Sequence, residues 1–300
     1  MTRQLIKKGL AAFLLSILTP GLGQVYNGEL LKGILGLAGM LGLLLLSTAV
    51  GLTHSFSGLI VHIALVLSAY VFLLGDAVFT AVRQVRMNQR PMHTWRSYLV
   101  SLSLLSISAV SLSASASDRV LGVRAYKMTA DSMLPTLASE DRIVADTRYY
   151  RSHTPQRGDL IVFKFPYQNH PDYIKRVIGV PGDRIKIVDQ HVYLNEQHLN
   201  EPFASHDPTA QHDPFFYTFP PAGADELLSS MQPEWAEQIF SSVDKGEIVV
   251  PPHKYFVMGD NRDRSWDSRY WGPIAADKIF GKALYIYWSK DKSRIGQTIR

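Results

Sequence analysis

Apolar residues are crowded into the first third of this chain, and the pattern changes near residue 117. Residues 31–52 and 59–79 are each long enough to cross a bilayer core, which takes about 20 mostly apolar residues. A third run, residues 97–114, is rich in serine. A soluble helix or strand is the alternative interpretation of that run, but the basic loop before it favours a span. We therefore predict a multi-pass membrane domain over residues 1–117.

The short apolar stretch at residues 10–28 is interrupted by Pro20 and three glycines. Basic residues before the stretch favour a cytoplasmic start, and basic residues after the second span favour a cytoplasmic end of that span. Tracing back through the two spans places the end of the stretch in the cytoplasm as well. Both ends of the stretch then face the cytoplasm, which predicts a re-entrant or interfacial segment, and everything after Ser117 is expected outside. The basic residues are Arg3, Lys7 and Lys8 before the stretch, and Arg83, Arg86, Arg90 and Arg96 after the second span.

Beyond Leu121 the pattern changes to short apolar runs separated by Gly, Pro and Asp turn signals. This spacing is typical of an antiparallel, mainly β domain, which we assign to residues 118–300. An insert at residues 200–249 is rich in Pro, His and Asp, and it contains a predicted helix at residues 225–230 or 233–241. The predicted strands cover residues 142–145, 160–165, 174–180, 184–188, 191–194, 255–258 and 283–288.

Composition excludes several kinds of chemistry. The chain has no cysteine, so it has no disulfide, thiol nucleophile or cysteine-ligated metal. Its net charge is +5, but several of the basic residues flank membrane segments instead of forming a patch, so we expect no nucleic-acid partner. The polar residues of the insert lack the compact spacing of metal ligands, so we expect a solvated loop and no metal there. They include His198, His206, Asp207, His212 and Asp213.

A candidate nucleophile is Ser132, which lies shortly before Pro135, a residue that stiffens the backbone. The candidate base is Lys175, which lies inside an apolar run that ends in a Pro-Gly turn. A lysine among Ile, Val and Tyr tends to lose its proton, because desolvation disfavours the charged form. Its pKa must fall from about 10.4 by roughly 2 to 3 units for the amine to act as a base near neutral pH. Lys127, Lys164 and Lys186 are the alternatives, in more polar settings.

Two further segments complete a pattern. Arg157-Gly158-Asp159 leads into a predicted strand, and residues 259–272 are dense in groups that hydrogen-bond and turn the chain. Together with the segments that carry Ser132 and Lys175, and in their order along the chain, these two segments resemble the motif boxes of bacterial type I signal peptidases. The resemblance runs from about Ala125 to Ser289. The resemblance implies two antiparallel sheets around one site. It also implies a membrane-bound serine endopeptidase, without a cofactor, that removes signal peptides from exported preproteins after an A-x-A-like site.

The resemblance assigns a role to each candidate residue. Ser132 is the expected nucleophile and Lys175 the expected general base of a Ser-Lys dyad. The other assignments are Ser265 as the residue that orients the lysine amine, Asp267 and Arg269 as a structural ion pair, Gly259 as a structural residue, and Met133, Leu137 and Ile174 as the lining of a substrate pocket for small side chains.

The chain departs from the family pattern in its oxyanion site. An acyl oxyanion needs preorganised donors, and the backbone N–H of Ser132 is one. Many Gram-negative relatives place a serine hydroxyl two residues before the nucleophile, where this chain has Ala130. Relatives of Gram-positive type also lack that hydroxyl, so activity is expected but the second donor is left open.

The expected location is the bacterial cytoplasmic (inner) membrane, with the catalytic domain on its periplasmic or extracytoplasmic side. Only residues 117–131 separate the third span from Ser132, so the nucleophile should lie near the outer membrane surface, where an exported precursor presents its cleavage site. Signal peptides and the lipid bilayer are the expected partners, and the oligomeric state is left open. The run from Pro20 to Gly33 also resembles small membrane modules of the TM2 or DUF5683 type, which is unusual in a signal peptidase.

Three alternatives accompany this interpretation. Ala114-Ser115-Ala116 follows an apolar run and has the form of a signal-peptide cleavage site, so self-cleavage after Ala116 is a hypothesis. A self-cleaving Ser-Lys protease resembling LexA-type repressors is the second, although the membrane spans and residues 259–272 argue against it. An inactive membrane scaffold that kept the peptidase framework is the third, and the presence of Ser132 and Lys175 disfavours it.

Overall fold

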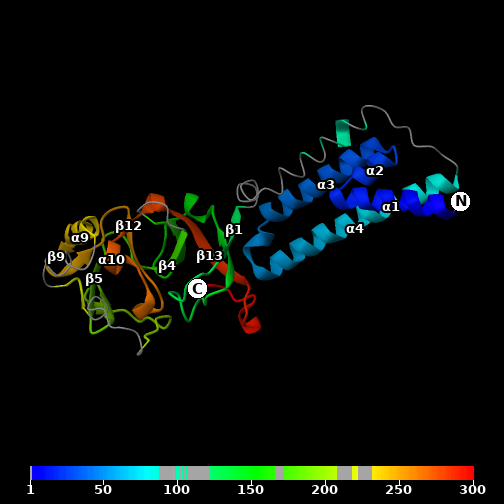
Figure 1. Cartoon of the computed structure of the whole chain (residues 1–300). Helices are drawn as coiled ribbons and strands as arrows, with labels where there is room; N and C mark the ends of the chain where they lie inside the picture. The colour runs from blue at the N-terminus through cyan, green and yellow to red at the C-terminus, as the bar shows by residue number, and fades with distance from the viewer. Residues whose placement is uncertain are drawn as a thin grey trace. The chain divides into compact units, whose positions relative to one another are not determined.

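The computed structural model divides the chain into two compact units, Met1–Gly122 and Val123–Arg300 (Figure 1). It describes residues 2–87, 97, 99–101, 103, 106, 122–165, 172–207, 218–221 and 232–300. The predicted boundary at residue 117, the A-x-A segment at residues 114–116, the alternative helix at residues 225–230, and His212 and Asp213 of the insert all lie outside these described residues.

The first unit is helical. It contains α1 (Thr2–Leu18), α2 (Leu22–Tyr26), α3 (Leu30–Ala49) and α4 (Phe56–Arg86), with a 3-10 turn at Leu52–His54. Two of these helices, α3 and α4, are long and apolar enough to cross a membrane, which agrees with the runs at residues 31–52 and 59–79. In the third predicted span, described residues 97, 99–101, 103 and 106 are helical, and Val100 packs against the cluster of Val25 and Leu37.

The segment before α3 forms a helical hairpin against α4. On α1, Ala12 is buried in one cluster with Ala77 and Ala81. The hydroxyl of Tyr70 donates to the carbonyl of Ser16 at 3.1 Å. The chain then reverses at Gly21, whose φ of 91° lies in the left-handed region that favours glycine.

The return arm α2 is held to the same part of α4 by buried amide side chains. Gln24 Nε2 donates to the carbonyl of Leu73 at 2.7 Å and to Asp76 Oδ2 at 3.1 Å. Asn27 Nδ2 donates to the carbonyl of Ala77 at 2.7 Å. These bonds satisfy polar groups that apolar surroundings would otherwise leave unpaired. The first half of α1, at Gly9, and the end of α2 therefore both lie beside the C-terminal half of α4.

The second unit is built on two antiparallel sheets (Figure 1). In the described residues, the larger sheet has the order β1-β2-β13-β3-β4-β11-β12, and the smaller has the order β7-β6-β5-β10-β9 with β8 paired to β5. The larger sheet contains β1 (Val123–Lys127), β2 (Arg142–Asp146), β3 (Leu160–Lys164), β4 (Asp172–Gly179), β11 (Lys254–Met258), β12 (Ile274–Ala275) and β13 (Ile279–Trp288). The smaller sheet contains β5 (Arg184–Val188), β6 (His191–Leu194), β7 (Gln197–His198), β8 (Thr218–Phe219), β9 (Val243–Asp244) and β10 (Glu247–Val249).

Two helices and several short turns complete this unit. The helices are α9 (Pro233–Phe240) and α10 (Ser268–Trp271), and the 3-10 turns are η2 (Tyr149–Arg151), η3 (Arg262–Arg264), η4 (Ala276–Lys278) and η5 (Lys292–Arg294). One apolar cluster takes side chains from both sheets and both helices, including Phe163, Trp235 and Trp271. A second cluster lies between β2, β3, β13 and the turn that carries Ser132.

The prediction of apolar N-terminal helices followed by an antiparallel, mainly β domain is confirmed. Each predicted strand overlaps an observed one, because short runs rich in apolar residues between turn signals are typical of strands. The helix at residues 233–241 corresponds to α9. The sequence reasoning missed β1 and the short strands β7, β8, β9, β10 and β12, which are too short to show a period.

Candidate active site

Ser132 lies in a tight turn between β1 and β2 that two buried side chains anchor. Met133 and Leu137 are fully buried in the second apolar cluster, and the N–H of Leu137 donates to the carbonyl of Met133 at 2.8 Å. On the other side of the turn, the N–H of Asn261 donates to the carbonyl of Ser132 at 3.2 Å. The turn is thus fixed both by the apolar cluster and by the backbone of Asn261, while Ser132 itself is half-buried.

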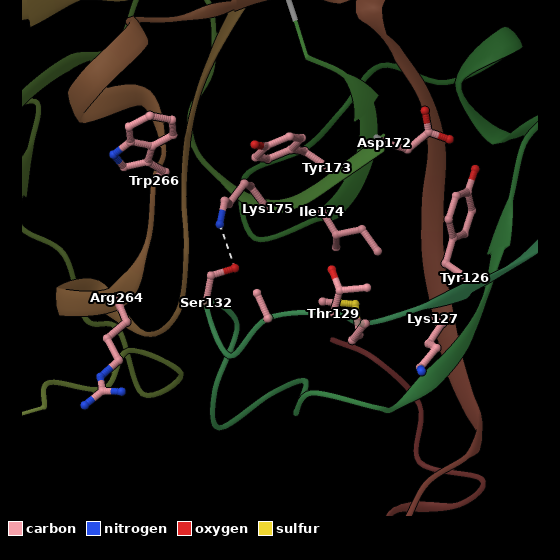
Figure 2. A pocket seen from close by; sticks show the side chains of 12 residues that line it. Tyr126, Lys127, Thr129, Ser132, Asp172, Tyr173, Ile174, Lys175, Arg264 and Trp266 are labelled. Atoms are coloured by element: carbon pink, nitrogen blue, oxygen red, sulfur yellow. Dashed lines mark hydrogen bonds between the residues drawn. The ribbon is translucent and has the colours of Figure 1, made fainter. Parts of the chain in front are cut away.

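Lys175 reaches this turn from the middle of β4. Its strand pairs with β3 through Ile161, and its side chain is buried. Lys175 Nζ donates to Ser132 Oγ at 2.8 Å (Figure 2). The two predicted residues therefore meet at hydrogen-bond distance, within reach of a proton transfer.

Burial lowers the pKa of Lys175 to about 8. Desolvation is the main cause, and the positive charge of Arg269 acts in the same direction. The carboxylates of Asp267 and Asp260 oppose the change because they stabilise the ammonium. A substantial fraction of the amine is therefore neutral in mildly alkaline solution. The alternative lysines differ, since Lys127 and Lys164 are exposed and paired with Glu140 and Asp172, and Lys186 is exposed.

Ser265 and Gly259 lie directly beside the turn. Ser265 is buried, and its hydroxyl has no hydrogen-bond partner among the described residues, so the predicted bond to Lys175 is not formed here. A Cβ on Gly259 would collide with the side chain of Ser265 and with the carbonyl of Ser132. Gly259 is therefore needed for the close approach of this loop to the Ser132 turn.

Asp267 and Arg269 form a buried ion pair behind the lysine. Arg269 Nη2 lies 2.8 Å from Asp267 Oδ2, and Arg269 Nε donates to Asp267 Oδ1 at 2.8 Å. Burial opposes ionisation of Asp267, but the Arg269 guanidinium holds the pKa of that carboxyl below its usual value. Asp267 also accepts the N–H of Gly259 at 3.0 Å, so the pair fixes the loop that faces Ser132.

A second buried ion pair was missed by the sequence reasoning. Arg176 follows Lys175 in β4, points to the other face of the strand, and pairs with Asp260 at 2.7 Å. Arg176 also donates to the carbonyl of Gly158, and Thr136 donates to Asp260. An arginine in the middle of an apolar strand was the available signal, because a buried guanidinium requires a carboxylate partner.

A cleft of about 300 Å³ contains the Ser132–Lys175 pair (Figure 2). Of the predicted pocket residues, Ile174 lines this cleft, whereas Met133 and Leu137 do not. These two pack into the core beneath the turn, because the tight turn directs them inward. The sequence reasoning did not single out Trp266 and Arg264, which line the cleft. The full lining is Tyr126, Lys127, Met128, Thr129, Ala130, Ser132, Asp172, Tyr173, Ile174, Lys175, Arg264 and Trp266.

One candidate oxyanion donor can be named. The backbone N–H of Ser132, a residue that lines the cleft, has no acceptor among the described residues. Ala130 lines the same cleft and offers no hydroxyl. No group of three or more metal-ligating side chains that could hold a metal ion lies among the described residues.

A hydroxyl in contact with a buried amine of lowered pKa, on a framework of antiparallel sheets, is the arrangement of a serine hydrolase whose base is a lysine. The model of the family described as signal peptidase, peptidase S26, matches residues 97–288, and the chain belongs to this family. The family is that of serine endopeptidases that process signal peptides, so the predicted family, enzyme class and signal peptidase function are confirmed.

Two curated relatives bear a signal peptidase I name. The chain is 29% identical over 208 residues to a probable signal peptidase I-2 of Synechocystis, covering 66% of this chain and 75% of the relative. It is 31% identical over 166 residues to signal peptidase IB of Staphylococcus aureus, covering 55% of this chain and 78% of the relative. A solved signal peptidase I from Enterococcus faecalis is 26% identical, with a TM-score of 0.27, and the match covers 43% of this chain and 97% of that one.

Proposed function

We propose that this protein cleaves signal peptides from exported preproteins with Ser132 as nucleophile and Lys175 as general base. The observation that carries the proposal is the 2.8 Å contact between Lys175 Nζ and Ser132 Oγ, in which the amine is buried and its pKa lowered to about 8. Serine is a poor nucleophile until a base removes its proton, and a neutral amine at this distance can do so. An inactive scaffold would have no need to bury a lysine against a serine.

The reaction proceeds in two stages. In the first, neutral Lys175 takes the hydroxyl proton as Ser132 Oγ attacks the scissile carbonyl carbon, and the oxyanion accepts the N–H of Ser132. The ammonium then returns the proton to the leaving amine, the C–N bond breaks, and an acyl-enzyme remains. In the second stage, Lys175 takes a proton from water, the resulting hydroxide attacks the ester, and the proton goes back to Ser132 Oγ.

The cleft accounts for the expected preference for small side chains. Its lining includes the small or apolar side chains of Ala130, Ile174 and Met128, which suit the small residues of an A-x-A-like site. An extended substrate segment can pass between the backbone of residues 126–130 and that of residues 172–175, adding a strand at this edge. Ser265 orients the amine only after a shift in side-chain position, because it makes no hydrogen bond in the described residues.

The proposed membrane arrangement places the catalytic unit outside a bacterial cytoplasmic membrane. In this arrangement α3, α4 and the third run at residues 97–114 span the bilayer, and the basic N-terminus and the C-terminal end of α4 lie inside. The helical hairpin of α1 and α2 supports a re-entrant segment, since both of its ends lie beside the C-terminal half of α4. We propose residues 1–117 as the membrane domain and residues 118–300 as the catalytic domain, and the division at Gly122 supports a boundary in this region.

The test is cleavage of a preprotein by the full-length enzyme in detergent. We expect the wild type to release the mature protein with a new N-terminus directly after the A-x-A-like segment, as read by mass spectrometry. The Ser132→Ala variant should fold, bind the preprotein and leave it intact. Cleavage by Ser132→Ala at the wild-type rate would show that another group is the nucleophile.

A further inference from the structure

The cleft continues past the Ser132–Lys175 pair to an end whose lining is chemically different. Figure 2 shows Trp266 and Arg264 on one side of the pair, and Ile174, Thr129 and Tyr126 on the other. The Ile174 side is mainly apolar near the pair and suits small residues. A substrate whose scissile carbonyl lies at Ser132 Oγ must occupy both sides, so the residues after the cleaved bond pass between Trp266 and Arg264.

Trp266 lines one side of this end of the cleft. It lies between Ser265 and Asp267, both buried, yet Trp266 itself is 52% exposed. The indole packs edge-on against Trp235 of α9, with ring centroids 5.9 Å apart and an interplanar angle of 89°. An exposed indole held by its buried neighbours offers a flat apolar surface to a passing chain.

Arg264 lines the other side of this end and is positively charged. It ends the 3-10 turn η3, and its side chain is 55% exposed. Its Nη2 lies 2.6 Å from Asp207 Oδ2. A guanidinium has five N–H donors in a planar fork, so one carboxylate partner leaves donors for a second. Among the described residues that line the cleft, Arg264 supplies the charge on this side of Lys175.

The insert holds the partner of Arg264 in place. The N–H of Ser205 donates to the carbonyl of Asp260 at 2.7 Å, and the N–H of Asp207 donates to Asp263 Oδ2 at 2.7 Å. The segment that carries Asp207 is therefore bound to the same loop as Arg264. The ion pair holds the guanidinium beside this loop, directed away from the Ser132–Lys175 pair (Figure 2), and Asp207 competes with any carboxylate that reaches the guanidinium.

We propose that Trp266 and Arg264 form the subsite for the first residues of the mature protein, and that Arg264 makes this subsite favour an acidic side chain. The inference rests on the proposed function, because it takes Ser132 as the point of attack. It assigns to the cleft a substrate preference beyond the small residues before the bond. The ion pair with Asp207 limits the strength of that preference.

The test uses three versions of one preprotein that carry Glu, Gln or Lys at the second residue after the cleaved bond. We measure kcat/KM for each with the full-length enzyme in detergent at low salt. For a half-exposed ion pair we expect the wild type to prefer Glu over Lys by about three- to fivefold, and the ratio should decrease as salt is added. Arg264→Gln should bring the ratio close to one, whereas Asp207→Asn should raise it above the wild-type value.

A matched control is Arg184→Gln in β5. Arg184 also pairs with an aspartate, Asp244, at 3.0 Å, but it does not line the cleft, so the Glu-to-Lys ratio should stay at the wild-type value. An unchanged ratio in Arg264→Gln would overturn the acidic subsite while leaving the dyad in place. Absence of cleavage of all three preproteins by the wild type would overturn both the subsite and the proposed function.

Discussion

The side-chain amine of Lys175 contacts the hydroxyl of Ser132 at 2.8 Å although 43 residues separate them in the chain. Each partner is anchored independently, Lys175 by the pairing of β4 with β3 and Ser132 by the burial of Met133 beside it. The contact is therefore a property of the larger sheet and the apolar cluster beneath it. Substitutions that shift the larger sheet or the apolar cluster should therefore change the rate of proton transfer from Ser132 to Lys175.

The first prediction concerns the pH dependence of cleavage. Lys175 acts only when neutral, and its pKa is about 8, so kcat/KM should rise with pH as the ammonium loses its proton. The neutral fraction increases about tenfold between pH 7 and pH 9 for such a group, and the rate should follow it. Steady-state kinetics on one preprotein across this range provides the measurement. A rate that is flat between these values would contradict the lysine as base.

The second prediction concerns replacement of the base. Lys175→Arg should reduce cleavage by about a thousandfold or more, because arginine does not deprotonate in proteins. Lys175→Met should be equally inactive but more stable than the wild type. Folding lowers the pKa of the amine from 10.5 to about 8, so at pH 7 the folded protein keeps an ammonium buried at a cost of about 3 kcal/mol.

The pH dependence of that stability gain supplies a check on its origin. Between the folded pKa near 8 and the unfolded value of 10.5, the unfolded chain binds more protons, so the wild type gains stability as pH rises. The advantage of Lys175→Met should therefore be full below pH 8 and decrease above it. Thermal unfolding of both full-length proteins in detergent, at several pH values, measures the difference. An advantage that grows with pH would be inconsistent with a buried ammonium.

The third prediction concerns the ion pair of Asp267 and Arg269. Asp267→Asn leaves the guanidinium of Arg269 buried without its partner, which should destabilise the protein by about 3–5 kcal/mol. It also removes a negative charge that raises the pKa of Lys175, so the pH profile of the remaining activity should move to lower pH. Asp244→Asn, at an exposed pair with Arg184, is the control and should change neither property. A profile that moved to higher pH would refute the electrostatic role.

The fourth prediction concerns the close approach of Gly259 to the Ser132 turn. Gly259→Ala places a methyl group against the carbonyl of Ser132 and the side chain of Ser265, and overpacking of this kind typically costs about 1–3 kcal/mol. The turn must shift to accommodate it, so kcat should fall more than stability alone explains. Gly281→Ala in β13, where the nearest atom would lie 3.4 Å from the new carbon, is the control. Equal kcat values for the two variants would argue against a positional role.

The fifth prediction concerns the membrane arrangement. The chain has no cysteine, so a single introduced cysteine is a unique label. His54→Cys, between α3 and α4, and Lys290→Cys, in the catalytic unit, should react with a membrane-impermeant maleimide in spheroplasts. Lys7→Cys should react only after lysis, because the N-terminus is expected inside. Labelling of Lys7→Cys in intact spheroplasts would show that residues 10–28 form a complete span.

Much of the architecture could be predicted from local patterns. The apolar runs that became α3 and α4, and the strands around Lys175, are visible because a span needs a long apolar run, and a short apolar run between turn signals is typical of a strand. Ser132 and Lys175 could be proposed because a rigid turn and a lysine among apolar residues are local features. For residues 10–28 the basic residues on both sides, with the proline and glycines, predicted a re-entrant or interfacial segment, and α1 and α2 cover this stretch.

The sequence by itself thus determined which segments are apolar enough for a membrane, where most of the longer strands form, and which hydroxyl and amine carry the candidate chemistry. Only the tertiary structure decided that Met133 and Leu137 support the turn from the core, while Trp266 and Arg264 line the cleft. It also brought Arg176 to Asp260, 84 residues away. The physical reason is that such contacts depend on the order of strands in the sheet and on which side of a turn is buried, and no local run of residues encodes either.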